Sequence, residues 1–281
     1  IHNRIEGITK QINNLESDIL FVSWLPPIQG IVRAYTTDDF DQQGNSSLQQ
    51  WQQRLNSLFQ STLTMNPGFS QVRYIHKSGT ELVRANRHGK YIEIVTDTDL
   101  QTKENKNYIE ETLKLGANEI FLSKIELNRE HGEVIVPFEP VLRAATPVYD
   151  GSGDVFGVVV INLNIEQLFN HLEIAFTRNQ QQLLIANAQG EFLLHPNGQK
   201  QFGFDRGNKY LIQDEFQVDL ADTELNSKQR AFSLVLGDKL VFLEKIVIKA
   251  KHSERTLFVA VEQDYKTITE SVTHALWDAV V

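Results

Sequence analysis

The sequence predicts an α+β fold in which a long N-terminal helix precedes two tandem modules, each an antiparallel sheet flanked by helices. A repeated pattern supports the duplication: an apolar run, a glycine turn and a second apolar run occur at 71–85 and again at 181–194. After an insert, each copy is followed by two more strand-like runs and a helix-like segment. The length of 281 residues suits two domains of about 100 to 150 residues each.

The first predicted element is an amphipathic helix within residues 1–35. Its apolar residues recur every three or four positions, as in the a and d positions of a coiled coil. They are Ile5, Ile8, Ile12, Leu15, Ile19 and Val22. This seam has two interpretations of similar weight, a helix docked on its own module or a parallel dimer interface, and both can hold along different stretches. Pro26–Pro27 is expected to break or kink the helix.

In the first module we expect a β-hairpin at 71–85 with glycine at its turn. Two later apolar runs, 141–148 and 155–163, predict a second hairpin. The Gly-rich segment 150–154 between them is interpreted as its turn. A helix is expected at 165–172.

The second module repeats this order. We expect a hairpin at 181–194 and strands at 240–248 and 256–262. A final helix is expected from Tyr265 onward, with apolar positions at Ile268, Val272, Ala275 and Ala279. The insert of this module is rich in aromatic residues, which we expect to fill a small core; they are Phe202, Phe204, Tyr210 and Phe216.

Composition excludes several functions. The formal net charge is −9 and the basic residues are scattered, so nucleic acid is not an expected partner. The chain has no cysteine, which excludes disulfides and thiolate metal sites and slightly favours an oxidising compartment such as the periplasm. It also lacks a signal peptide and any apolar run of about 18 residues.

Both ends suggest a piece of a longer protein. The chain opens on Ile1 without an initiator methionine, and it stops at Val281 within an apolar helical segment. A helix at each end is the arrangement expected for a sensor loop between two transmembrane helices.

An enzyme is one alternative, because His131 lies beside Glu130 and Glu133, a pattern that can bind a metal or transfer a proton. However, the sequence lacks the zinc-protease, nucleophile-elbow and nucleotide-binding motifs. Oxygen ligands at 97–99 with Glu93 could hold a hard cation, but a solvated acidic loop explains them better. We therefore expect no catalytic residue, no metal site and no cofactor.

The segment Leu127–Asp150 reads LNREHGEVIVPFEPVLRAATPVYD and contains L-N-R-E-x-G, P-x-x-P and an Arg followed by a Pro. In these features it resembles the double CACHE (tandem PAS-like) extracytoplasmic sensor domains of bacterial transmembrane receptors, most of all sensor histidine kinases. Supporting pieces lie at 83–86, 100–108 and 121–125. The resemblance covers nearly the whole chain and is stronger over 71–172 than over the second module.

The resemblance implies a division of the chain into four parts. Residues 1–35 would be the stalk or dimerisation helix, and 36–172 the membrane-distal, ligand-binding PAS-like module. Residues 173–262 would be the membrane-proximal PAS-like module, and 263–281 a helix leading to a transmembrane segment. We expect the proximal module to relay the signal, its own side chains filling the pocket.

In such a domain the ligand is expected between the distal sheet and its insert, where a few convergent polar groups fix its orientation. The candidate ligand-binding residues are Arg84, Asn86, Tyr108, Ser123, Arg143 and Asn162. Arg84 and Arg143 could each bind a carboxylate through two hydrogen bonds. Each candidate taken alone could instead form a structural ion pair, cap a strand end or pack in the core.

Two departures from the amino-acid-binding members concern the ligand. Those members carry an Asp on the last distal strand that binds the ligand amine, whereas Asn162 stands at that place here and supplies a neutral amide. Their tryptophan-containing motif is also missing from 100–115. An α-amino acid is therefore disfavoured, and an anionic or neutral small molecule fits as well.

The predicted function is ligand sensing on the periplasmic side of the cell membrane, in a homodimer formed through the N-terminal helix. Ligand binding would shift the population of distal-module conformations and be relayed to a cytoplasmic output, for which we favour a histidine kinase. A diguanylate cyclase or chemoreceptor output is an alternative, and so is a binding or adhesion module that does not signal.

Overall fold

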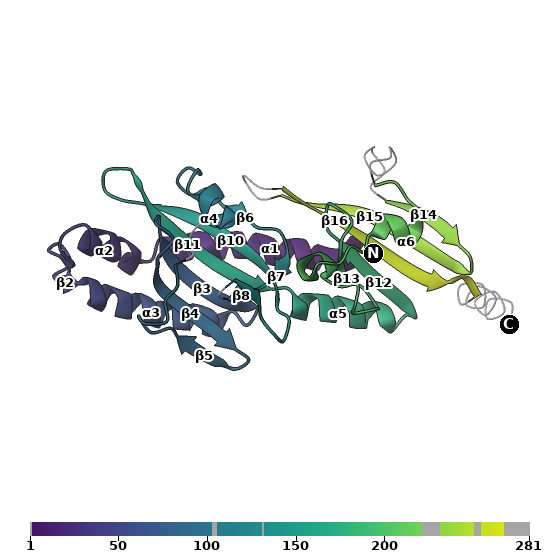
Figure 1. Ribbon diagram of the computed structural model, residues 1–281, viewed down its shortest axis with the longest axis horizontal. Helices are drawn as coiled ribbons and strands as arrows, with labels where there is room; N and C mark the ends of the chain where they lie inside the picture. The colour runs from purple at the N-terminus through teal and green to yellow at the C-terminus, as the bar shows by residue number, and fades with distance from the viewer. Residues whose placement is uncertain (1, 103–105, 131, 221–230, 250–253, 267–281) are drawn as a thin grey trace, which may run out of the picture. The chain divides into compact units, whose positions relative to one another are not determined.

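The computed structural model describes residues 2–102, 106–130, 132–220, 231–249 and 254–266. These residues form two compact units (Figure 1). The larger unit comprises Ile8–Ile165 with a short segment at 249–254. The smaller unit comprises Glu166–Ile248, the described residues from Arg255 onward and those before Ile8.

Two helices open the chain. Helix α1 spans His2–Ser23, and α2 spans Pro26–Tyr35, with proline in its first turn. The break between them lies at the predicted Pro26–Pro27 position, because proline fits the first turn of a helix but not its interior. Among the described residues, no helix is both long enough and apolar enough to cross a membrane.

The predicted seam of α1 is buried within the chain. Ile12, Leu15 and Ile19 have no exposed surface and Val22 is 1% exposed, although no second copy of the chain is present. Along this stretch the helix is therefore docked on its own protein, the first of the two interpretations. The side chains of Ile5 and Ile8 lie outside the described part of the structure.

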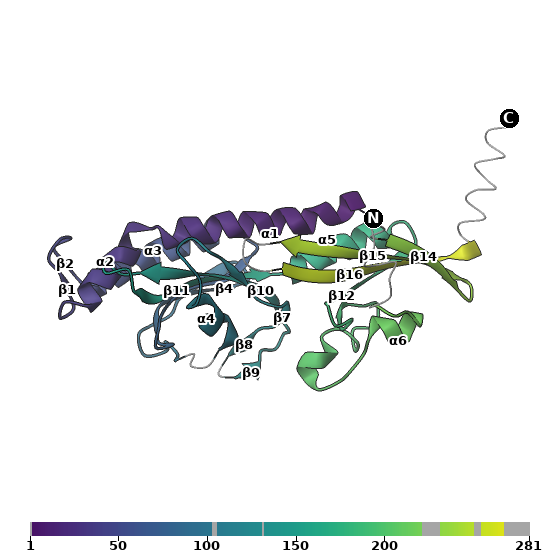
Figure 2. The same cartoon turned by 90° about the horizontal axis from the view of Figure 1, so that it is seen from above.

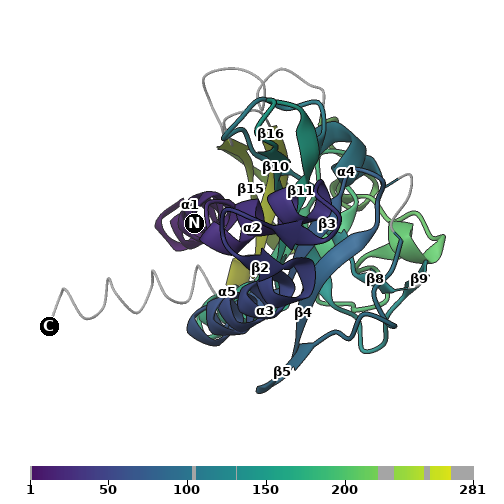
Figure 3. The same ribbon diagram turned by 90° about the vertical axis from the view of Figure 1, so that its left-hand side faces the viewer.

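A third helix, α3 at Leu48–Met65, follows the small hairpin of β1 (Phe40–Asp41) and β2 (Ser46–Ser47). Its start is fixed by a capping box in which the Gln50 backbone donates to the Ser47 hydroxyl and the Ser47 backbone donates to the Gln50 side chain. Helices α2 and α3 pack side by side (Figure 3).

The larger unit is built on a seven-stranded sheet whose paired strands are all antiparallel. Its main path runs β5-β4-β3-β11-β10-β6, and β7 also pairs with β10. The strands are β3 Phe69–His76, β4 Glu81–His88, β5 Tyr91–Ile94, β6 Phe121–Leu122, β7 Glu126–Leu127, β10 Pro140–Tyr149 and β11 Val155–Asn164. A separate short hairpin is formed by β8 Arg129–Glu130 and β9 Glu133–Val134.

Each face of this sheet is covered by different elements. Figure 2 shows α3 and the part of α1 in this unit on one side, and helix α4 (Asn107–Thr112) with β8 and β9 on the other. Since side chains alternate between the faces of a strand, Val72 and Tyr74 of β3 face away from α4, whereas Gln71 and Arg73 lie on the α4 face. Ile75, on the same face as Gln71 and Arg73, packs in one apolar cluster with Ile109 of α4.

The smaller unit has a five-stranded antiparallel sheet in the order β13-β12-β16-β15-β14. Its strands are β12 Gln181–Ala186, β13 Phe192–Leu194, β14 Ala231–Leu236, β15 Lys239–Lys249 and β16 Glu254–Asp264. Helix α5 (Glu166–Thr177) packs on β12, and α6 (Ile212–Phe216) follows the 3-10 turn η1 (Gly203–Arg206). Phe192, Phe216 and Phe258 lie in one buried core cluster.

The predicted fold class is confirmed. Both hairpins that define the repeat are present, β3–β4 and β12–β13, with Gly79 and Gly190 at positive φ in their turns. The Gly-rich segment 150–154 is the turn between β10 and β11, with Gly153 at a φ of 88°. The start of the expected final helix differs: β16 continues to Asp264, so residues 263–264 are strand. Most of that helix, at 267–281, lies outside the described residues.

Candidate functional site

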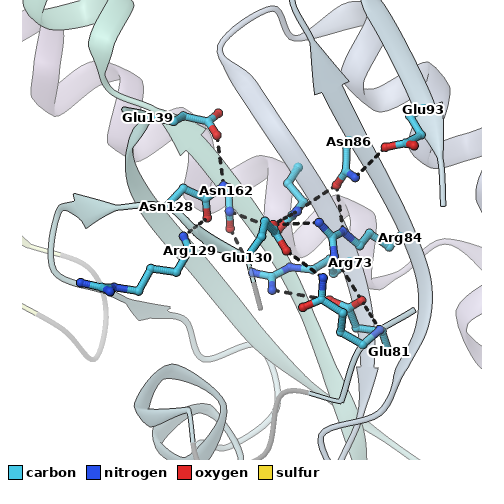
Figure 4. Close-up of polar contacts among 12 residues, drawn as sticks. Arg73, Glu81, Arg84, Asn86, Glu93, Asn128, Arg129, Glu130, Glu139 and Asn162 are labelled. Carbon is cyan, nitrogen blue, oxygen red and sulfur yellow. Dashed lines mark hydrogen bonds and ion pairs between the residues drawn. The ribbon is translucent and has the colours of Figure 1, made fainter. Parts of the chain in front are cut away.

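Polar side chains form a row across the α4 face of the larger sheet. The strand register places Arg143 of β10 opposite Asn162 of β11, Asn162 opposite Gln71 of β3, Gln71 opposite Asn86 of β4, and Asn86 opposite Glu93 of β5. Directly paired residues on one face lie about 5 Å apart, so these five side chains are neighbours. Figure 4 shows part of this row.

Two positions farther along the strands, a second row contains two more arginines. Arg73 of β3 lies opposite Arg84 of β4, while the neighbouring positions on β10 and β11 are Ala145 and Val160. Together with the polar row they form what we call the sheet-face cluster, completed by Glu81, Glu126, Asn128, Glu130, Gln101 and Tyr108.

Arg73 lies at the centre of the cluster and is 3% exposed. Its Nη1 donates to the Tyr108 hydroxyl at 2.9 Å, and its Nη2 donates to Asn162 Oδ1 at 3.2 Å. The Tyr108 ring also lies beside two guanidinium groups, with its centroid 5.4 Å from Cζ of Arg73 and 5.5 Å from Cζ of Arg143.

Arg84 is held by three different partners. Its Nε donates to Asn86 Oδ1 at 2.9 Å, and its Nη1 lies 3.5 Å from Glu81 Oε2. Its Nη2 lies 2.8 Å from Glu130 Oε1. The first two partners belong to β4 itself, whereas Glu130 belongs to the short strand β8.

The amides of the polar row are joined in a chain. Asn162 Nδ2 donates to Gln71 Oε1 at 3.2 Å, and Gln71 Nε2 donates to Asn86 Oδ1 at 2.8 Å. Asn86 Nδ2 then donates to Glu93 Oε2 at 3.0 Å. This bond and the bond from His88 lower the pKa of Glu93. The ionised form of Glu93 is therefore favoured at the end of this row of hydrogen bonds.

Arg143 joins β10 to β7 and to Asn128, which follows β7. Its Nη1 contacts Glu126 Oε1 at 2.5 Å and its Nη2 donates to Asn128 Oδ1 at 3.2 Å. Burial lowers the pKa of Arg143 and Glu126 opposes that effect. Ser123 lies next to Arg143 but acts on the backbone: its hydroxyl donates to the Lys124 carbonyl and accepts from the Arg143 amide.

An apolar patch borders the polar rows toward the other end of the strands. It consists of Ile75, Ile109, Ala145, Val158 and Val160, with Tyr108 and Leu113 packed against it. A site with polar anchors at one side and apolar contacts at the other is typical of small-molecule recognition.

The arginines of the cluster are buried, and the cluster is nearly balanced in charge. Its arginines are each at most 5% exposed, and carboxylates lie beside them. Among the described residues, two of the buried side-chain atoms without a hydrogen-bond partner belong to the cluster, Arg73 Nε and Glu81 Oε1. Buried polar atoms are rarely left without a partner, so these two mark the centre of the cluster as a place where further hydrogen bonds can form.

The structure brings most of the sequence-predicted site residues together. Arg84 bonds to Asn86, and Gln71 links Asn86 to Asn162. The ring of Tyr108 lies beside the Arg73 guanidinium group. Ser123 is the exception, because its hydroxyl is occupied by backbone groups.

The cluster also contains residues that were not predicted from the sequence: Gln71, Arg73, Glu81, Gln101, Glu126 and Asn128. Glu130 was expected only as part of an enzyme motif. The predicted hairpin contained the signal for the first two residues. Once Gly79 is placed in the turn, antiparallel pairing brings Arg73 opposite Arg84 and Gln71 opposite Asn86.

The described residues of the alternative enzyme and cation sites have other partners. His131 lies outside the described residues, and Glu130 bonds to Arg84, Gln71 and Gln101. In the part of the chain that the structure describes, no group of three or more acidic or histidine side chains is placed to hold a metal ion. Within 97–99, Asp99 accepts a bond from the Thr96 hydroxyl.

The smaller unit has a compact polar contact of its own. His195 is 6% exposed, its Nδ1 accepts from the Asn197 amide at 2.8 Å, and its Nε2 lies 3.1 Å from Glu215 Oε1. Because Nδ1 is an acceptor, the neutral ring carries its proton on Nε2 and donates it to Glu215. Lys200 donates to the same carboxylate at 2.7 Å, so this contact fixes the loop before η1 to α6.

Solved structures share this fold. A domain of a sensory box/GGDEF family protein from Vibrio parahaemolyticus has a TM-score of 0.73 at 19% identity, covering 95% of this chain and 93% of that one. The extracellular domain of vpHK1S-Z8, described as a histidine kinase, has a TM-score of 0.71 at 18% identity and covers 97% of both chains. The ligand-binding domain of the Pseudomonas fluorescens chemoreceptor CtaA, in complex with L-alanine, has a TM-score of 0.55 at 14% identity. The match covers 94% of this chain and 93% of that one.

No curated protein sequence matches the chain. The family model for the sensor domain of bacterial histidine kinases, however, matches residues 34–244, which is more than half of the chain and includes the sheet-face cluster. The chain therefore belongs to the family of bacterial histidine kinase sensor domains.

Proposed function

We propose that this sensor domain binds a small molecule at the sheet-face cluster of the larger unit. The observation that carries the proposal is the set of three buried arginines, Arg73, Arg84 and Arg143, held on one face of the seven-stranded sheet beside an apolar patch. A structural core does not need three guanidinium groups, because burying each one carries a large desolvation penalty.

The proposed ligand is anionic. Each arginine presents a planar fork of donors that suits a carboxylate, and Arg73 has a buried Nε with no partner. The solved chemoreceptor domain is in complex with L-alanine, but here Asn162 provides a neutral amide and accepts from Arg73. An ammonium group at that point would lie beside a guanidinium group, so a carboxylate without an α-amino group is the better fit.

The larger unit is proposed as the membrane-distal module and the smaller unit as the membrane-proximal module. We place the domain on the extracytoplasmic face of the membrane, within a longer protein that has flanking transmembrane helices and a histidine kinase output. The Vibrio parahaemolyticus neighbour belongs to a GGDEF family protein, which keeps a diguanylate cyclase output as the second candidate.

The N-terminal helix is also proposed to form a homodimer, with the dimer contact on a face other than the predicted seam. The seam residues from Ile12 to Val22 are buried within the chain. Phe21 and Trp24, by contrast, are 68% and 71% exposed. Large exposed aromatic side chains in neighbouring positions are typical of protein interfaces.

The direct test is a thermal-stability screen of the chain against carboxylates, phosphates, amino acids, amines and purines. A ligand that binds only the folded state must raise the midpoint by mass action. We expect carboxylate hits that weaken at least tenfold in Arg84→Lys, because a lysine cannot reproduce the fork of donors. Arg178→Ala, which removes an exposed positive charge from the smaller unit, is the control and should leave the hits unchanged. A set of hits indifferent to Arg84, Arg73 and Arg143 would place binding elsewhere.

A further inference from the structure

Glu130 differs from the other carboxylate beside Arg84 in the element that carries it. Glu81 belongs to β4 of the sheet, whereas Glu130 belongs to β8, a two-residue strand that, within the described residues, pairs with the two residues of β9. The Glu130 side chain is 23% exposed, whereas that of Arg84 is 6% exposed. Glu130 therefore approaches Arg84 from the solvent side of the cluster.

The bonds around Glu130 are those of a carboxylate-binding site. Its Oε1 lies 2.8 Å from Arg84 Nη2 and accepts from Gln71 Nε2 at 3.3 Å. Its Oε2 accepts from Gln101 Nε2 at 2.9 Å. One guanidinium and two amide donors thus converge on the carboxylate, and charge-assisted bonds of this kind are the strong ones.

The two donors on the sheet are held independently of Glu130. Arg84 is fixed by its bond to Asn86, and Gln71 by its bonds to Asn86 and Asn162. Departure of the Glu130 side chain would leave both donors in position while breaking no strand pairing in the seven-stranded sheet. Arg84 and Arg73 would then share the Glu81 carboxylate, and Arg84 Nη2 would lose its contact with Glu130.

We propose that the Glu130 carboxylate occupies the place of the ligand's carboxylate, so that the ligand binds by displacing it from Arg84, Gln71 and Gln101. This inference rests on the proposed function and adds to it a ligand class, a small carboxylate, and a built-in competitor. The exchange conserves charge, because one carboxylate replaces another beside the same guanidinium group. The competitor lowers the apparent affinity by the fraction of time for which it holds the site.

The test uses acetate, the group that Glu130→Ala removes. Acetate should raise the thermal midpoint of Glu130→Ala in a saturable way, with chloride at equal ionic strength as the salt control. Half-saturation should need about tenfold less acetate than in the wild type, as expected if Glu130 holds the site for about nine-tenths of the time. Adding Arg84→Gln should abolish the response.

Glu133→Ala is the matched control. Glu133 lies opposite Glu130 in the β8–β9 hairpin and is exposed. The Glu133→Ala substitution therefore removes the same charge from the hairpin without removing a partner of Arg84. It should respond to acetate like the wild type. An equal response of Glu130→Ala, Glu133→Ala and wild type would overturn the inference, because acetate would then not bind where Glu130 was.

Glu130→Gln keeps the size of the side chain and serves if the alanine variant does not fold. A carboxylate found in the wild-type screen should bind it about tenfold more tightly than it binds Glu133→Gln. An Arg84-dependent hit with the same affinity for both variants would refute the competition while leaving the proposed function intact. Acetate rescue without any Arg84-dependent hit in the screen would support the competing carboxylate and count against ligand sensing at this site.

Discussion

At the residue scale, Glu81 is the carboxylate that the sheet itself places between two buried arginines. Its Oε1 lies 3.8 Å from Arg73 Nη1 and its Oε2 lies 3.5 Å from Arg84 Nη1. We expect Glu81→Gln to lower the free energy of unfolding by about 2 kcal/mol, because both guanidinium groups lose a buried counter-charge. Urea unfolding measures this loss. Glu110→Gln, an exposed change on α4, should stay within about 0.5 kcal/mol of the wild type, and equal losses in both variants would contradict the argument.

Asp41 predicts how the protein responds to acid. Two bonds from Arg33, at 3.0 and 2.8 Å, lower the pKa of this carboxyl, with burial opposing and the Trp51 Nε1 bond adding to the effect. Because the folded pKa lies below the unfolded value of about 3.9, the unfolded chain takes up the proton first. The stabilisation by Asp41 is thus complete above about pH 4 and is lost as pH falls through the lower folded pKa.

Asp41→Asn should therefore destabilise the protein at neutral pH and flatten the fall of its thermal midpoint below about pH 4. Thermal midpoints measured from pH 7 down to pH 2 test this expectation. Asp97→Asn, at an exposed loop position, should reproduce the wild-type curve. An acid limb as steep in Asp41→Asn as in the wild type would show that other groups cause the loss.

At the scale of elements, the close approach of β11 to β3 depends on Gly157. A Cβ atom at this position would meet the Ile75 carbonyl oxygen at 2.3 Å, and a backbone atom cannot move aside without shifting the strand. We expect Gly157→Ala to cost about 1 to 3 kcal/mol by urea unfolding. Gly151→Ala is the control, since an added Cβ there meets nothing within 4 Å. Its free energy of unfolding should match or exceed that of the wild type.

The sequence predicted these strands well, because alternation and glycine turns are local signals. It predicted the site only in part, because the site depends on which strands are neighbours. Asn162 and Gln71 are ninety-one positions apart and meet only through the pairing of β11 with β3. Glu130 reaches Arg84 through a two-residue strand, and no periodic pattern announces an element that short. The composition of the site therefore depends on pairing between strands that are distant in sequence, which local patterns do not predict.

At the scale of the whole molecule, sensing requires that the ligand prefer one conformation over another. The available energy is that difference in affinity, typically about 1 to 3 kcal/mol. In the larger unit, the Arg84–Glu130 contact joins the sheet to β8, and the Arg143–Glu126 contact joins β10 to β7 within the sheet. If a ligand replaces such contacts in only one of two conformations, the difference in binding free energy can shift the population between them.

The exposed aromatic residues at the end of the N-terminal helix are expected to mediate self-association. Phe21 lies in the last turn of α1 and Trp24 directly follows the helix. Both side chains are largely exposed, and Trp24 Nε1 donates to Asn118 Oδ1 at 3.0 Å. Their exposed aromatic surface favours contact with a second copy of the chain. Phe21→Ser should weaken dimerisation at least tenfold, and Phe21→Ser with Trp24→Ser should leave a monomer across the micromolar range, as measured by light scattering after gel filtration. Tyr91→Ser, which removes an equally exposed aromatic residue from β5, should keep the wild-type mass. A wild-type mass that matches the monomer at every concentration would refute this interface, whereas a dimer insensitive to both aromatic changes would assign dimerisation to another surface.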